Sequence, residues 1–143
     1  MLERKTQPVF RNINKINYQK PDTFTLSNGV PVFAFFAESD KIIGLEIIFN
    51  AGVWFQPKVL LASTTNAMLR EGTQLYTSGD ISEKLDFFGA HLSAHVEKDK
   101  AVVGLYCPHK HFSSVLKILT DIVMHPIFPQ NELDILIKKR KEQ

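Results

Sequence analysis

The chain has 143 residues, 44% of them hydrophobic and 22% charged, with 17 basic residues against 15 acidic ones. This is one domain's worth of chain, and the composition excludes a disordered or collagen-like protein. A net charge of +2 is too small to predict nucleic-acid binding, and the single cysteine, Cys107, excludes a disulfide framework. The sequence shows no apolar stretch of about 20 residues and no signal peptide, which favours a cytoplasmic protein without a membrane span and leaves a periplasmic one open.

The first half of the sequence predicts an extended arm over residues 1–22, followed by a domain over residues 23–143. Residues 23–33 favour a hairpin, because Asn28-Gly29 is the strongest short turn signal. Apolar and polar residues alternate over residues 42–49, which predicts a half-buried strand. The side chains on its apolar face are Ile43, Leu45, Ile47 and Phe49.

Helices are predicted next. Pro57 is expected to open a helix that stops at Gly72. Asp80 with Glu83 three residues later resembles a capping box, and the helix that it starts should end at Gly89.

The second half of the sequence alternates again over residues 91–96 and 102–107, which predicts two strands joined at Lys98-Asp99. Helical spacing over residues 112–123 gives the clearest helix, ended by His125-Pro126. A last helix begins near Leu133, and the chain stops inside it. The predicted fold class is α+β: an antiparallel sheet with helices packed on one face, incomplete at its C-terminal end.

Five motifs in this order resemble the N-terminal domain of the pitrilysin/insulinase (M16) family of zinc peptidases. The resemblance covers residues 24–143 and looks most like the bacterial branch in which a metal-bearing subunit works with one that bears none. The motifs are Leu-Ser-Asn-Gly-Val-Pro-Val at 26–32, Asn-Ala-Gly-Val-Trp at 50–54, the segment 62–73, Phe-Gly-Ala-His-Leu-Ser-Ala at 88–94 with Asp99, and His-Pro-Ile-Phe at 125–128.

Enzymes of that family carry an inverted His-x-x-Glu-His on a helix, where two His bind zinc and Glu acts as base. Alignment of residues 62–73 with this helix places Ser63 and Ala67 at the two His positions and Asn66 at the base position. The third ligand, a Glu, falls at Gln143 or, with a slip of one residue, at Glu142. The resemblance therefore implies a domain without zinc or another cofactor that is not itself a peptidase.

The same resemblance implies a binding role for the strand at residues 91–96. In the family, substrate adds to this edge as an extra strand, held by backbone hydrogen bonds. His91, Ser93 and Ala94 mark the edge here, and a plain sheet strand is the alternative. Implied partners are a second M16-type subunit or remaining domain, an extended peptide, or a second copy of the chain that covers the apolar helix face of Leu133, Leu136 and Ile137.

Other residue clusters have competing interpretations. For Cys107, His109 and His111, a metal site is less favoured than a strand-to-helix junction at Cys107-Pro108, with the two His in the exposed first turn of the helix. His91 and His95 lie about 13 Å apart along a strand, too far to share an ion. Ser63, Thr64 and Thr65 favour a polar helix face over a nucleophile. We expect four aromatic residues to lie in the core and not in a recognition patch: Trp54, Phe55, Phe87 and Phe88. We expect Lys138-Lys-Arg-Lys141 to form a solvated helix face.

The leading hypothesis is a non-catalytic, peptide-binding half that works with a zinc-bearing partner. Two alternatives remain: an interaction module without a peptidase role, and an active metallopeptidase whose metal site lies outside this fragment.

Overall fold

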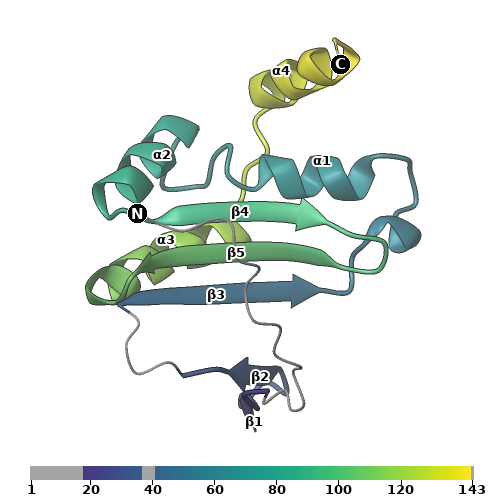
Figure 1. The fold of residues 1–143 in the computed structure, drawn as a ribbon. Coiled ribbons are helices and arrows are strands. Elements are labelled where there is room, and N and C mark those ends of the chain that lie inside the picture. Colours follow the sequence, from purple (N-terminus) through teal and green to yellow (C-terminus); the bar gives the residue numbers. More distant parts are fainter. Residues whose placement is uncertain (1–17, 37–40, 143) are drawn as a thin grey trace, which may run out of the picture. The chain divides into compact units, whose positions relative to one another are not determined.

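A computed structural model describes residues 18–36 and 41–142. The chain divides into two units, residues 1–39 and 40–143, which are considered one at a time (Figure 1). Most of the predicted arm over residues 1–22 lies outside the described residues.

The first unit contains the predicted hairpin. Strand β1 (Asp22–Thr25) pairs antiparallel with β2 (Pro31–Ala34). Gly29 has φ +85°, a left-handed conformation that glycine adopts without a steric penalty. Its N–H donates to the Leu26 carbonyl at 2.9 Å. The Asn-Gly turn signal therefore predicted this element correctly.

The second unit is built on a three-stranded antiparallel sheet. Its strands are β3 (Ile42–Phe49), β4 (His91–Val96) and β5 (Ala101–Pro108), in the order β3-β5-β4. The register pairs Ile47 with Val103 and Leu92 with Leu105. All three strands were predicted from alternation, and β3 has the predicted bounds. Because β5 is central, β3 and β4 are the two edges of this sheet.

The core lies on the sheet face that the helices cover. Helices α2 (Ser78–Phe87) and α3 (Phe112–Met124) pack against the inward side chains of β4 and β5. Figure 1 shows α3 running across the sheet on this side. The α+β class with helices on one face is confirmed. The core cluster consists of Ile81, Leu85, Leu92, Val103, Leu105, Cys107, Val115, Ile118, Leu119 and Ile122.

Helix α2 starts three residues earlier than the sequence suggested. Thr77 is its N-cap: its hydroxyl accepts the Asp80 N–H at 3.2 Å, and the Asp80 carboxylate accepts the Thr77 N–H at 2.9 Å. The expected box of Asp80 and Glu83 is wrong, because Asp80 is the last residue of the box and not the first. The hydrogen bonds from Thr77, together with Lys84, hold the pKa of Asp80 below its usual value. The predicted end of α2 at Gly89 is confirmed by its φ of +60°.

Helix α1 (Leu61–Met68) begins four residues after Pro57, so the expected start is wrong. Leu60 adopts a left-handed φ of +66° immediately before the helix, which breaks any helical path from Pro57. The Gln56 side chain accepts the Ala62 N–H at 3.1 Å and satisfies one free donor of the first turn. A short 3₁₀ helix, η1 (Val53–Phe55), precedes this turn.

Helix α4 (Gln130–Lys141) has no buried residue. Ile137 is exposed, as expected of an uncovered apolar face, whereas Leu133 and Leu136 are half-buried. Within residues 18–36 and 41–142, no helix is long and apolar enough to span a bilayer.

Candidate functional site

The helix that resembles the family's zinc helix is α1, and its central polar residue is fully buried. The Asn66 amide donates to the His95 carbonyl at 2.6 Å and lies 3.4 Å from the Val102 carbonyl. These two carbonyls belong to paired residues of β4 and β5. Asn66 therefore ties α1 to the hairpin that β4 and β5 form, and its amide group is occupied by backbone oxygens.

The other two motif positions also make no metal-like arrangement. The Ser63 hydroxyl donates to the Leu60 carbonyl at 3.1 Å, within its own helix turn. Ala67 offers only a methyl group. Zinc ligands in proteins are thiolate, imidazole or carboxylate groups, so Ser63, Asn66 and Ala67 do not fit the ion.

The third expected ligand position is Glu142 or Gln143. Glu142 is exposed at the end of α4, and Gln143 lies outside the described residues. Among residues 18–36 and 41–142, no three His, Cys, Asp or Glu side chains gather closely enough to hold a metal ion. The donor set at the family position does not fit a zinc centre.

An arginine that the sequence did not single out connects α4 to α1 at this point. The Arg140 guanidinium donates to the Thr64 hydroxyl at 2.7 Å and to the Ser63 carbonyl at 3.3 Å. The expectation of a solvated basic face is therefore wrong for Arg140, although Lys138, Lys139 and Lys141 are exposed. Sequence separation of 76 residues hides this contact from any local pattern.

On the outer side of β4, backbone groups have no hydrogen-bond partner among the residues that the structure describes. The Glu97 N–H donates to the Lys100 carbonyl at 2.7 Å, so hydrogen bonding toward β5 alternates from this pair along the strand. Ser93 and His95 are then hydrogen-bonded to β5, and Leu92 and Ala94 turn their N–H and C=O groups away from it. The contacts of Asn66 agree with this alternation. Its amide approaches the carbonyls of both His95 and Val102, as expected if the two carbonyls point into the space between β4 and β5.

The side chains of the predicted edge residues separate onto two faces. His91 and Ser93 lie on the face opposite the helices, whereas Ala94 lies on the helix side and is exposed. The Ser93 hydroxyl is 3.5 Å from the Gly104 carbonyl. On the same face, Tyr106 donates to Glu46 at 2.6 Å, and this hydrogen bond is the main cause that raises the pKa of Tyr106.

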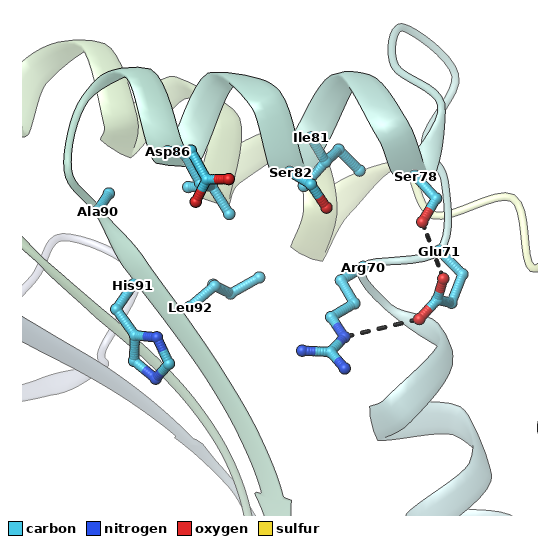
Figure 2. A pocket seen from close by; sticks show the side chains of 10 residues that line it. Arg70, Glu71, Ser78, Ile81, Ser82, Asp86, Ala90, His91 and Leu92 are labelled. Carbon is cyan, nitrogen blue, oxygen red and sulfur yellow. Dashed lines mark hydrogen bonds and ion pairs between the residues drawn. The ribbon is translucent and has the colours of Figure 1, made fainter.

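A cavity of about 370 Å³ lies between α2, the end of α1 and the first residues of β4. Figure 2 shows Ser82 and Asp86 projecting from α2 toward β4, with Arg70 reaching into the same space from the end of α1. The Arg70 Nε lies 3.6 Å from a carboxylate oxygen of Glu71, whose other oxygen accepts the Ser78 hydroxyl at 2.9 Å. Sequence patterns did not indicate this cavity, because its residues come from three elements.

The remaining sequence candidates do not form sites. Cys107 points into the core, and burial raises the pKa of its thiol. His109 and His111 form the short 3₁₀ helix η2 (His109–His111), and the His111 ring packs against Phe88 at 5.3 Å between ring centroids. The predicted helix start is thus confirmed, except that the turn is 3₁₀ and that His111 is half-buried, so only His109 is exposed as expected.

The aromatic residues behave differently from the expectation. Phe88 packs against the core, but Trp54, Phe55 and Phe87 are exposed by 72%, 63% and 81%. The core interpretation is therefore wrong for these three. Trp54 and Phe55 belong to η1, which hydrogen-bonds to the backbone of the turn between β4 and β5, and that contact leaves their rings outside.

The solved structures that are similar to this chain include two bacterial proteins. A peptidase M16 inactive domain from Pseudomonas fluorescens is 27% identical with a TM-score of 0.80, over 85% of this chain and 30% of that chain. A protease from Helicobacter pylori is 16% identical with a TM-score of 0.70, over 80% of this chain and 29% of that chain, and it shows the fold alone. This chain thus spans less than a third of either neighbour's length.

Curated proteins give no match to the chain. The model of the insulinase family (peptidase family M16) matches residues 43–143. In the part of the chain that the structure describes, this range holds the three-stranded sheet except its first residue, Ile42, and the helices α1 to α4. That match covers well over half of the sequence, and it agrees with the fold similarity. The chain belongs to the insulinase family, peptidase family M16.

Proposed function

We propose that this chain is a non-catalytic, peptide-binding half of an M16-type assembly and works beside a zinc-bearing partner. The observation that carries the proposal is the state of Asn66. An amide cannot take a proton from water, and this one is buried against the carbonyls of His95 and Val102. The similarity to an inactive M16 domain supports this assignment.

Peptide binding is assigned to the outer edge of β4. Leu92 and Ala94 turn backbone N–H and C=O groups outward, and an extended peptide can pair with these groups as an additional strand. Such pairing needs no catalytic side chain. Binding can therefore persist in a domain whose zinc helix has taken a structural role.

A first experiment separates this proposal from an active peptidase. The purified chain is incubated with an unstructured fluorogenic peptide and zinc, with and without a chelator. We expect no cleavage in either sample. Chelator-sensitive cleavage, or stoichiometric zinc bound through Ser63 or Ala67, would overturn the proposal.

A second experiment tests the edge directly. Ala94→Pro removes an outward N–H without breaking a bond to β5, because proline is tolerated where its nitrogen faces away from the ladder. Ala94→Ser keeps that N–H and serves as the matched control. We expect Ala94→Pro to weaken peptide binding, measured by fluorescence anisotropy, while Ala94→Ser binds like the wild type. Equal binding by both variants contradicts the edge assignment.

The contact site for the partner is assigned to exposed apolar side chains of the second unit, residues 40–143. Trp54 and Phe87 are largely exposed, and α4 presents Ile135 and Ile137 to solvent. Large exposed apolar groups mark protein–protein contact sites. We expect the isolated chain to self-associate in analytical ultracentrifugation, with Ile135→Lys on α4 shifting it toward monomer. A wild-type monomer at all concentrations contradicts this part of the proposal.

A further inference from the structure

We propose that the cavity between α2 and β4 binds the side chain of a lysine or arginine in the peptide that pairs with β4. This inference rests on the proposed function, since the peptide must first add to the strand edge. It goes further by naming the chemical class of residue that the site selects.

The position of the cavity follows from the sheet. Leu92 lines it, and the Leu92 backbone faces outward from β4. A residue paired across from Leu92 in an added strand points its side chain to the same sheet face as Leu92, because paired residues share a face. That face is the helix side, where α2 lies. The side chain of this peptide residue therefore enters the cavity.

The inner wall of the cavity is apolar. Ile81 and Leu85 of α2 face Leu92 of β4, and all three are buried core residues. Figure 2 shows Leu92 directed into the space below α2. Such a wall suits the methylene stem of a long charged side chain, which buries its carbons and keeps its charge at a polar rim.

The rim of the cavity carries one uncompensated negative charge. Arg70 and Glu71 offset each other at 3.6 Å, and Ser78 donates a further hydrogen bond to Glu71. Asp86 has no ion-pair or side-chain hydrogen-bond partner in the part of the chain that the structure describes, and it projects into the cavity with Ser82. His91 also lines the cavity, and Figure 2 shows its ring turned away from α2.

The charges at the rim of the cavity favour a basic peptide side chain over an acidic one. An ammonium or guanidinium group beside Asp86 gains an ion pair and a neighbouring hydroxyl, that of Ser82. An acidic side chain in the same place meets the carboxylate of Asp86, while the positive charge of Arg70 is offset by Glu71 at 3.6 Å. Complementary charge at a partly exposed rim gives selectivity more than affinity.

The test compares peptides that differ at one central residue, which is lysine, norleucine or glutamate. Fluorescence anisotropy at low ionic strength measures their binding to the chain. We expect the lysine peptide to bind about three- to tenfold more tightly than the glutamate peptide, as for a partly exposed charge pair. Asp86→Asn should remove most of this difference. Asp99→Asn, in the turn at the far end of β4, makes the same charge change away from the cavity and should leave the difference intact.

The outcomes separate the two proposals. Binding that is lost in Ala94→Pro but equal for lysine and glutamate overturns the cavity proposal and leaves the edge proposal standing. A lysine preference that survives Asp86→Asn also overturns it. If the wild type binds none of the three peptides, both proposals fail. Circular dichroism of each variant checks that the fold is retained.

Discussion

Helices α3 and α4 differ in how they are held to the rest of the domain. Both repeat apolar residues at helical spacing, yet α3 buries Val115, Ile118, Leu119 and Ile122, whereas α4 buries nothing. Helix α4 is connected to α1 through Arg140. Apolar spacing therefore predicts that a helix forms, but not whether it reaches a core.

Helices α1 and α2 lie between these extremes. Helix α1 is attached to the sheet by the buried Asn66 amide and also buries Met68, and α2 depends on both Ile81 and its Thr77 cap. Helices α1 to α4 thus form a series, from a helix held by apolar burial to one held by the polar contacts of a single residue, Arg140. Each of the following variants tests one member of the series.

The largest change in the free energy of unfolding is expected for a variant in α3. Ile122 is fully buried in the core cluster, and Ile122→Ala should lower the free energy of unfolding by about 2–5 kcal/mol, from lost burial and the cavity left behind. Ile135→Ala in α4 is the matched control and should change it by less than about 0.5 kcal/mol, since Ile135 is 46% exposed. Chemical denaturation measures both. Similar losses in the two variants would abolish the contrast between α3 and α4.

The next effect is expected in α1. Asn66→Ala removes a buried donor from two carbonyls and should cost about 1–3 kcal/mol of unfolding free energy. Asn66→Asp keeps the shape but places an acceptor against the same oxygens, so it should destabilise at least as strongly. A stable Asn66→Asp variant would show that the amide is not an anchor.

A smaller effect is expected at the start of α2. Thr77→Ala removes the cap hydroxyl and should cost about 1 kcal/mol. The pKa of Asp80 is lowered by Thr77, so this part of the stability is present above the ordinary carboxyl pKa and is lost as pH falls through the folded-state value. Denaturation at neutral and acidic pH should therefore show a weaker acid dependence in Thr77→Ala, and an unchanged dependence would count against the box.

The smallest effect is expected in α4. Arg140→Ala removes the contacts with Thr64 and Ser63, which lie near the surface, and should cost less than about 1 kcal/mol. Amide hydrogen exchange is the sensitive measurement, because the α4 amides should exchange faster while those of α3 do not change. Arg140→Lys keeps the charge without the planar fork and should fall between wild type and Arg140→Ala. Unchanged exchange in α4 would mean that Arg140 does not hold it.

Prediction from sequence succeeded where the signal was local. Asn28-Gly29 marked its hairpin, the alternation of β3 gave its bounds, and the spacing of residues 112–123 gave α3. The starts of α1 and α2 were missed, because Leu60 and Thr77 act through backbone conformation and a hydrogen-bonded cap. Exposure of Trp54 and Phe87 was also missed, since an aromatic side chain alone does not reveal which side of an element faces the core.

The candidate site divides in the same way. The sequence by itself determined which groups stand at Ser63, Asn66 and Ala67, and that their chemistry does not suit zinc. Only the tertiary structure decided that Asn66 is a buried anchor, that Arg140 meets α1, and that Asp86 faces the cavity beside β4. The physical reason is distance along the chain. Donor chemistry belongs to single residues, but burial and charge compensation arise only when segments far apart in sequence are brought together.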